Sequence, residues 1–454
     1  MSILNHAAQQ PGSAIGRVET SVDSLAGKFL HVVLYITVLS GAYVVVEPAP
    51  YEFLAAVLGF ACILARVPFN RVIVPLFVLL LIRDAGGVIG LLFIQGSGFL
   101  RVAGDPTPIL TPFGPDDSAR FLAISFYLGM TSVVFAWIFA QDTMRAIGNV
   151  RSAYIVCGTL AGLLGTLGYF ATFFDFLPAL KDFAMNERAV GAFKDPNVLG
   201  CFLVPPLIWL IEGFVVDKIR PLSLIASILM LLGALLSFSR AAWGSIAFCI
   251  IMLMYLLFLT QKDRRARIVF LVVGGIGAAA VVLICLSSID IVREMLTARL
   301  GVQDYDVGAD NRSRFMLQAD SLREILDHPL GMGPWGFAHT TSWVSHNSYL
   351  GTLLNHGWIG GAAYLLLTAL TLYIGFKAIW IRTPWQTFLI GTYLAYVALA
   401  LEALIVDTDH WRHYYLLLGL VWGLTAATVK FTRGTLFTRR TTAPDARGAQ
   451  ESLA

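Results

Sequence analysis

Residues 237–260 read SFSRAAWGSIAFCIIMLMYLLFLT, and they carry the clearest indication of fold in the chain. After Arg240 no charged side chain occurs as far as Thr260, and almost every residue is apolar. An apolar run of about 20 residues is long enough to cross the hydrocarbon core of a bilayer as an α-helix. The stretch therefore predicts a transmembrane helix over residues 241–260, with Arg240 at its end.

Runs of the same kind recur along the whole chain. The sequence is 57% hydrophobic and 13% charged, with a mean hydropathy of +0.73, which excludes an ordinary soluble domain. We predict an all-α polytopic integral membrane protein with about twelve transmembrane helices. Their expected ranges are 29–46, 51–65, 72–95, 120–140, 152–174, 198–216, 221–238, 241–260, 268–288, 358–377, 386–404 and 413–429.

The distribution of Lys and Arg predicts the orientation of these helices. If the N-terminus lies inside and the spans alternate, the inner segments hold the larger share of Lys and Arg, including QKDRRAR at 261–267. This bias is typical of the cytoplasmic side of a membrane protein, so we expect both termini in the cytoplasm. Residues 1–28 lack the short apolar core of a removable signal peptide.

The predicted spans divide the chain into five parts. We expect a cytoplasmic N-terminal tail, transmembrane helices 1–9, a large outer loop, transmembrane helices 10–12 and a disordered cytoplasmic tail, over residues 1–28, 29–288, 289–357, 358–429 and 430–454. The outer loop is far longer than a connection requires, which is typical of a functional loop. Within it, RSRFMLQADSLREILDHP has apolar residues at nearly helical spacing and ends at Pro329. This segment predicts an amphipathic helix on the outer surface.

Basic residues at the outer ends of the spans form the first candidate site. They are Arg188, Lys194, Arg240, Arg312 and Arg314. A single arginine at the end of a span ordinarily contacts lipid headgroups or extends toward water. Arg240, however, stands among small residues that leave room for a ligand. Because a guanidinium group binds phosphate oxygens through paired hydrogen bonds, the set indicates an anionic partner.

His346 is the second candidate, and it opens the stretch HNSYLGTLLNHGWIGG at residues 346–361. Outside the cytoplasm there is no pool of nucleotide sugars, so an activated sugar would arrive as a lipid-linked diphosphate. Its transfer requires a base that removes a proton from the acceptor hydroxyl, and histidine suits this task. The simpler interpretation is a polar residue at a helix start, beside Asn347. We expect a short surface helix that breaks at GWIGG, with His346 facing the active-site cavity beside the loop arginines and His356 packed.

Other polar residues give weaker indications. Arg83 and Asp84 lie within the third predicted span, where they would form a structural ion pair or mark a polar lumen. The segment VDTDHWRH, residues 406–413, resembles a metal site only loosely, and we interpret it as a solvated loop. The five cysteines share no ligand spacing. We therefore expect neither a metal nor a cofactor.

Four motifs stand in order between roughly residues 185 and 361. They are ERAVGAFKDPNVLG, with Gly-x-Phe-x-Asp-Pro-Asn; SFSRAAWGS, with a Ser-Arg turn; RFMLQADSLREILDHPLGMGPWGF, with an Arg, a helix and His-Pro-Leu-Gly-x-Gly; and HNSYLGTLLNHGWIGG, with His, Asn and two glycines. Together they resemble the bacterial O-antigen ligase and polysaccharide polymerase superfamily. The first of them is similar to an element of the exopolysaccharide polymerases.

This resemblance implies a metal-independent, inverting glycosyltransferase of the GT-C type at the periplasmic face of the bacterial inner membrane. Such enzymes move a glycan from undecaprenyl diphosphate to a hydroxyl group. Carried over residue by residue, the motifs make His346 the catalytic base. The diphosphate-binding arginines would be Arg240, Arg314 and Arg188. The supporting residues would be Asn347, Lys194 and Arg312; of the two loop arginines we choose Arg314, because the apolar spacing after it fits the motif better.

The acceptor and one rival class of protein remain open. A polymerase transfers the glycan to another lipid-linked repeat unit, a ligase transfers it to lipid A-core, and protein O-glycosylation is a third choice. We favour a polymerase, because the Asp-Pro-Asn element and the chain length are similar to those of exopolysaccharide polymerases. A lipid-glycan flippase also often has twelve spans, but it should place polar residues near the midplane, whereas here they gather at the outer ends. The expected partners are the bilayer, the lipid-linked donor, a glycan or lipid A-core acceptor and other polysaccharide assembly proteins, without nucleic acid.

Overall fold

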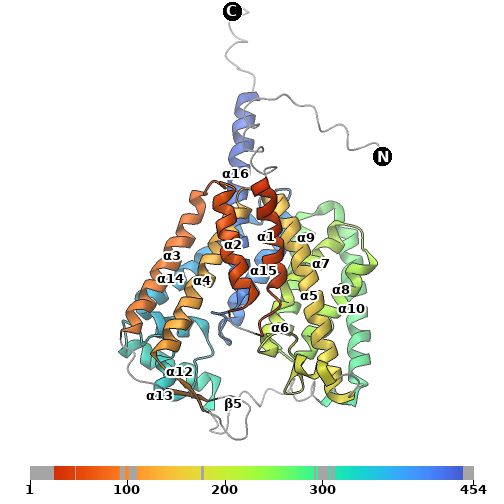
Figure 1. Cartoon of the computed structure of the whole chain (residues 1–454). Helices are drawn as coiled ribbons and strands as arrows, with labels where there is room; N and C mark the ends of the chain where they lie inside the picture. Colours follow the sequence, from red (N-terminus) through yellow and green to blue (C-terminus); the bar gives the residue numbers. More distant parts are fainter. Residues whose placement is uncertain are drawn as a thin grey trace, which may run out of the picture.

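The computed structural model describes residues 25–45, 48–92, 98–101, 110–174, 178–290, 293–294, 306–307 and 312–442. The predicted tails before residue 25 and after residue 442, and most of the outer loop before residue 312, lie outside these ranges. The described chain is a bundle of helices with a few two-residue to four-residue strands (Figure 1). This confirms an all-α polytopic membrane protein.

A helix covers each predicted span, and the sixth span is divided into two helices. The helices are α1 (Leu25–Ser40), α2 (Pro50–Leu64), α3 (Val74–Leu91), α4 (Pro115–Phe139), α5 (Thr143–Phe174), α6 (Pro196–Phe202), α7 (Val204–Val216), α8 (Pro221–Leu236), α9 (Arg240–Thr260), α10 (Arg265–Ser287), α14 (Ser348–Ala378), α15 (Gln386–Glu402) and α16 (Arg412–Thr442). Among the described residues, seven helical segments are long and apolar enough to cross a membrane, and four more are apolar but shorter. The number of spans therefore stays a prediction.

Short elements occupy the connections. They are the helices α12 (Arg314–Asp327) and α13 (Gly336–Thr341), the 3₁₀-helices η2 (Arg71–Ile73), η3 (Pro178–Phe183) and η4 (Lys262–Arg264), and the antiparallel pairs β1 (Gly98–Arg101) with β2 (Leu110–Phe113), β3 (Ala184–Met185) with β4 (Arg188–Ala189), and β5 (Asp306–Val307) with β6 (Arg312–Ser313). Helix α12 confirms that the predicted segment is helical, and it buries Leu317, Ser321 and Ile325 along one face. Most of the apolar side chains on which the amphipathic prediction rested are exposed, namely Phe315, Met316, Leu322 and Leu326. The position of α12 on the membrane surface stays a prediction. Both α12 and α13 lie at the end of the bundle opposite the protruding end of α16 (Figure 1).

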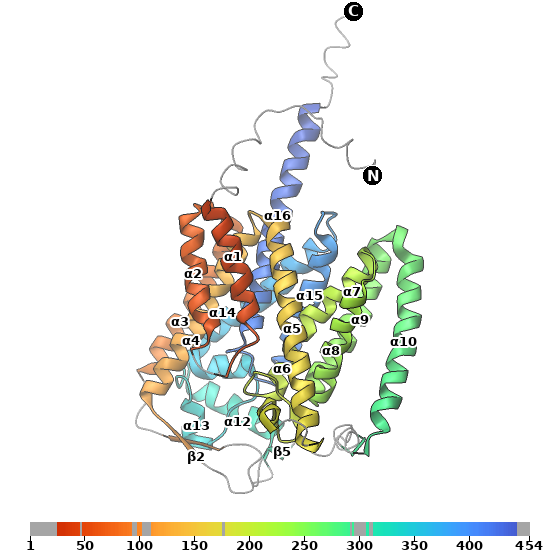
Figure 2. The ribbon, with the colours of Figure 1, turned by 45° about the vertical axis from the view of Figure 1, so that its right-hand side comes forward.

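Helix α16 forms the centre of the bundle, whereas α10 stands at its edge (Figure 2). Trp422 of α16 is buried, and its Nε1 donates to the Thr371 hydroxyl of α14 at 2.8 Å. A Cβ on Gly423 would lie 2.6 Å from the Cβ of Phe139, so glycine allows α4 to pack directly on α16. By contrast, apolar side chains of α10 such as Phe270 are exposed. This pattern suits a bundle whose outer surface meets lipid rather than water.

Helix α14 breaks at Gly357, within the GWIGG stretch where the sequence predicted a break. Its φ of 66° and ψ of −174° lie in a backbone region almost restricted to glycine. A Cβ at this position would lie 2.6 Å from the carbonyl carbon of Leu330. The loop after α12 packs into the break, where the Trp358 N–H donates to the Pro329 carbonyl at 2.9 Å. The His-Pro-Leu-Gly-x-Gly motif is thus attached to α14 through backbone contacts.

Helix α3 packs against the same break through glycines. A Cβ on Gly86 would collide with the carbonyl of His356, and one on Gly90 would lie 2.7 Å from the carbonyl of Asn355. Such close approach is typical of helix pairs in membranes. The buried His356 ring places its Nδ1 2.9 Å from the carbonyl oxygen of Arg83 on α3. The structure therefore confirms that His356 packs.

Gly357→Ala should lower the thermal stability of the purified protein. The substitution places a side chain in a backbone region that costs about 1–3 kcal/mol, and the added Cβ would collide with the Leu330 carbonyl carbon at 2.6 Å. Gly148→Ala in α5 is the matched control, because nothing lies within 4 Å of its Cβ. The apparent Tm in detergent is the measurement. Equal values for the two variants would contradict the role given to the break.

Candidate functional site

The start of α14 is held by the α15–α16 loop, residues 403–411. Asn347 caps α14, and its Oδ1 accepts hydrogen bonds from two backbone N–H groups of the first turn at 3.0 and 3.1 Å. The Asn347 Nδ2 donates to the carbonyl of Leu404 at 3.0 Å. The Ser348 N–H donates to the carbonyl of Ala403 at 2.8 Å. One asparagine therefore ends the long outer loop, begins the helix and ties both to the neighbouring loop.

His346 stands directly before this cap in a left-handed conformation, with φ of 49°. That conformation is uncommon for a residue other than glycine and often marks a functional site. The His346 side chain is partly buried. This burial, and then the nearby Arg314 charge, lower the pKa of His346 to about 4. The imidazole is neutral at pH 7 and able to accept a proton. Within the described part of the chain the ring makes no hydrogen bond, so its nitrogens are available to a ligand.

Arg314 begins α12 and reaches the same loop, because its Nη1 donates to the carbonyl of Ile405 at 3.1 Å. Its charge acts on both His346 and Asp407. The structure therefore brings the predicted base, its neighbouring Asn and the chosen loop arginine together. The side chain of Arg312, the other loop arginine, lies outside the described residues.

A buried network anchors the α15–α16 loop to the bundle. The guanidinium group of Arg83 is buried, and it donates to Asp84 Oδ1 at 2.8 Å and to the Tyr415 hydroxyl at 3.0 Å. Asp409 accepts from the Tyr415 hydroxyl at 3.1 Å and from the Ser125 hydroxyl at 2.7 Å. Arg83 and Asp84 thus form a structural ion pair. The Arg83 guanidinium group also lies 3.7 Å from a carboxylate oxygen of Asp409 on the loop.

The interpretation of residues 406–413 as a solvated loop is wrong for its two carboxylates. Asp407 accepts a hydrogen bond from the backbone N–H of Asn347, and burial followed by the charge of Asp409 raises the pKa of Asp407 to about 6. Burial alone would also raise the pKa of Asp409, but the Arg83 guanidinium lowers it. Two aspartates two residues apart beside a span are only a weak signal in the sequence. Their partners could not be identified, because Ser125 is 284 residues from Asp409.

Two of the remaining predicted residues, Arg188 and Arg240, lie at the turn between α8 and α9. Arg188 donates from Nε to the Ser237 carbonyl at 2.8 Å and from Nη2 to Asn197 Oδ1 at 2.9 Å. Arg240 follows within the same turn as the first residue of α9. Arg188 therefore supports the turn that carries Arg240. Lys194 is exposed in the segment that precedes α6.

The end of α15 contacts the neighbourhoods of both groups of residues. Glu402 is buried and accepts a hydrogen bond from the Ser245 hydroxyl in the second turn of α9, the helix that begins at Arg240. Two residues later, the Leu404 carbonyl accepts from Asn347. One short segment of chain thus connects the helix of Arg240 with the cap beside His346.

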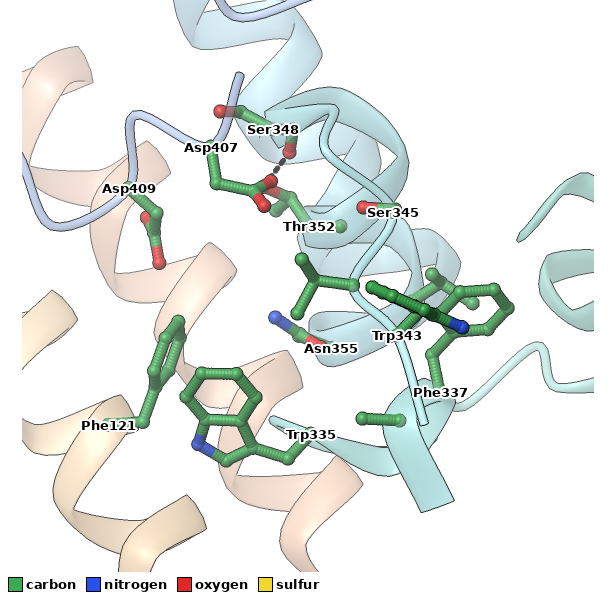
Figure 3. A pocket seen from close by; sticks show the side chains of 14 residues that line it. Phe121, Trp335, Phe337, Trp343, Ser345, Ser348, Thr352, Asn355, Asp407 and Asp409 are labelled. Atoms are coloured by element: carbon green, nitrogen blue, oxygen red, sulfur yellow. Dashed lines mark hydrogen bonds between the residues drawn. The ribbon is translucent and has the colours of Figure 1, made fainter. Parts of the chain in front are cut away.

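A cavity of about 120 Å³ lies beside the cap of α14. Its large lining side chains are Phe121, Trp335, Phe337, Trp343, Asn355, Asp407 and Asp409 (Figure 3). Ser345 and Ser348, on either side of His346 in sequence, also line it. His346 is not among the described lining residues, so the structure supports its expected position beside Arg314 but does not confirm that it faces this cavity.

An apolar groove of about 470 Å³ lies between α14 and α15. It is lined by Asn347, Tyr349, Leu350, Leu365, Leu372, Val397, Ala400, Leu401 and Leu404. Leu365, Leu401 and Leu404 are exposed on the outside of the bundle, where a bilayer would surround the helices. The groove therefore lies where a bilayer would bring it into contact with lipid, and it reaches Asn347, the residue after His346.

The comparison with known proteins concerns the middle part of the chain, which holds three of these residues. The model of the family described as O-antigen ligase matches residues 225–365, which include Arg240, Arg314 and His346. This match confirms the resemblance to the O-antigen ligase and polymerase superfamily. No curated protein matches the chain. Among the described residues, no group of three or more His, Cys, Asp or Glu could hold a metal ion.

The low pKa of His346 predicts how its reactivity depends on pH. Diethyl pyrocarbonate modifies only neutral imidazole, so the modification of His346 should stay constant from pH 8 to about pH 5 and fall to half near its pKa of about 4. Arg314→Gln removes a nearby positive charge and should move this midpoint upward, whereas Arg323→Gln, an exposed arginine on the same helix, should not. Site-resolved mass spectrometry measures the midpoint. A native midpoint near 6.5, the ordinary value, would contradict the described environment.

Proposed function

We propose that this protein is a glycosyltransferase that moves a glycan from undecaprenyl diphosphate to an acceptor hydroxyl at the periplasmic face of the bacterial inner membrane. The observation that carries the proposal is a neutral His346 beside Arg314, next to a groove that faces lipid. The match to O-antigen ligase supports a glycan as substrate. The first helix begins and the last helix ends at the side of the bundle opposite the site, in agreement with cytoplasmic termini and a periplasmic site (Figure 1).

The apolar groove supports a donor with a lipid anchor. We expect the polyprenyl chain to lie between α14 and α15, so that its diphosphate reaches the end of the groove near Asn347. Arg314 and Arg240 would bind the diphosphate, since guanidinium groups form paired hydrogen bonds with phosphate oxygens. Arg188 already donates to Ser237 and Asn197, so it would contribute mainly by supporting the turn of Arg240.

In the proposed reaction His346 removes the proton of the acceptor hydroxyl. The acceptor oxygen then forms a bond to the anomeric carbon, and the bond from that carbon to the diphosphate oxygen breaks with inversion. The arginines stabilise the negative charge that grows on the leaving diphosphate. Because the bound diphosphate also offsets the charge of Arg314, the pKa of His346 should rise when the donor binds, which makes the base stronger in the loaded site.

For the acceptor, we propose a second lipid-linked glycan, which makes the protein a polymerase. Support comes from the similarity of the Asp195-Pro196-Asn197 element, and of the chain length, to those of exopolysaccharide polymerases. In the structure this element caps α6 through the Asp195 carboxylate and holds Arg188 through Asn197. The description of the matching family favours a second candidate, a ligase that attaches glycan to lipid A-core. With purified protein, a polymerase should extend a lipid-linked glycan by itself. A ligase should form product only after lipid A-core is added.

His346→Ala should reduce transfer in this assay by about 100-fold or more, because positioned general bases contribute about 10²–10⁴-fold to rate. The matched control is His328→Ala, which removes an exposed histidine at the end of α12 and should leave transfer unchanged. Product is measured by gel analysis, and the amount of each variant in the membrane is measured with an affinity tag. Near-normal product from His346→Ala would exclude it as the base.

Arg314→Lys and Arg240→Lys should each reduce transfer by about tenfold or more, although both keep the positive charge. A lysine cannot form the paired hydrogen bonds, and a hydrogen bond to a charged group contributes about 1.5–3 kcal/mol. Arg323→Lys in α12 is the control, since its side chain is 84% exposed. Initial rates at several donor concentrations are the measurement. If both variants transfer at the native rate, neither arginine binds the diphosphate in the proposed way.

A further inference from the structure

One wall of the cavity beside the cap of α14 is aromatic. The rings of Phe121 and Trp335 meet edge to face with their centres 5.2 Å apart. The ring of Phe121 also lies against the ring of His410, with 4.0 Å between the two ring centres. Trp335 has a left-handed backbone, with φ of 67°, directly before α13. These contacts fix the positions of the rings at the edge of the cavity (Figure 3).

The opposite wall is polar and carries negative charge. Asp407 and Asp409 lie on the α15–α16 loop, and the amide of Asn355 extends between them and the aromatic rings (Figure 3). In the described residues the Asn355 side chain has no hydrogen bond within the protein, whereas the Thr352 hydroxyl donates to the Ser348 carbonyl at 2.6 Å. The amide of Asn355 and the carboxylate of Asp407 are therefore the main groups that this wall offers to a ligand.

We propose that this cavity binds one sugar ring of the acceptor glycan, an inference that rests on the proposed glycosyltransferase function. A sugar ring has apolar C–H faces that pack on aromatic rings, and hydroxyl groups that donate to carboxylates and exchange hydrogen bonds with amides. The volume of about 120 Å³ is well below that of a pocket for a drug-sized ligand, so it limits the occupant to about one ring. Two carboxylates in the wall disfavour a phosphate group.

Charge thus separates two binding regions. The diphosphate would lie on the side of Arg314, and the uncharged, hydroxyl-rich ring would lie on the side of Asp407 and Asp409. The backbone next to His346 connects them, because Ser345 and Ser348 line the cavity and Asn347 donates to Asp407. A ring held there would present a hydroxyl group close to the base. This position fits the acceptor, since the donor sugar is attached to the diphosphate.

The test measures binding without any transfer. Purified full-length protein in lipid nanodiscs is titrated with oligosaccharide fragments of the host cell's own surface polysaccharide, and saturation-transfer NMR reports their affinity. Asn355→Leu keeps the size of the side chain but removes the amide, and Trp335→Leu removes the ring. Each should weaken binding by about tenfold, the effect of about 1.4 kcal/mol. Arg323→Lys, an exposed position on α12, should bind the fragments with native affinity, because this residue does not line the cavity.

Asp407→Asn provides a second measurement that keeps the shape of the cavity. This substitution should also weaken the binding of the fragments, since an amide accepts fewer hydrogen bonds than a carboxylate. All variants must elute as single species with native Tm before they are compared. Unchanged affinity in these three variants, or no saturable binding to the native protein, would overturn the proposal. A failure of the proposed function is seen separately, as native transfer by His346→Ala.

Discussion

The rest of the structure depends on the ion pairs that the buried guanidinium group of Arg83 forms. A charge inside a membrane bundle is costly unless it is paired, and Arg83 is paired with Asp84 on its own helix and with Asp409 on the α15–α16 loop. This requirement fixes the loop against α3, α4 and α16. The carbonyl of the same arginine contacts His356, just before the break in α14. One residue therefore couples the packing of four helices to the loop that holds Asn347.

The motifs that resemble those of the superfamily largely serve to place side chains. Asp195 caps α6, and its neighbour Asn197 accepts from Arg188. The His-Pro-Leu-Gly-x-Gly segment fills the break at Gly357 with backbone contacts. The Asn of the His-Asn pair caps α14, and only the His is left with ring nitrogens that a ligand could use. A few chemically active groups thus depend on a much larger set of residues that hold the backbone.

Sequence reasoning succeeded where the information is local. Long apolar runs identified every helix of the bundle, the glycines of GWIGG identified the break in α14, and the spacing before Pro329 identified α12. It missed the division of the sixth predicted span at Leu203, although Pro205 and Pro206 follow directly and proline interrupts helical hydrogen bonds.

The failures at the site have a common cause, which is separation along the chain. The aspartates of the α15–α16 loop looked solvated because their partners, Ser125 and Arg83, belong to helices hundreds of residues away. Similarly, no local pattern shows that Arg188 donates to the turn of Arg240. The His-Asn pair could be found because its two roles, base and helix cap, belong to adjacent residues.

The groove between α14 and α15 has exposed leucines on the outside of the bundle, so in a bilayer it would open sideways, toward the acyl chains, rather than toward water. Any molecule that fills it must therefore arrive by lateral diffusion within the membrane plane. Its effective concentration is its mole fraction among the lipids, which does not change when the aqueous volume is diluted. Occupancy of the site would then respond to membrane composition and area, and a detergent micelle, which isolates each protein from the shared lipid pool, would uncouple it from that supply.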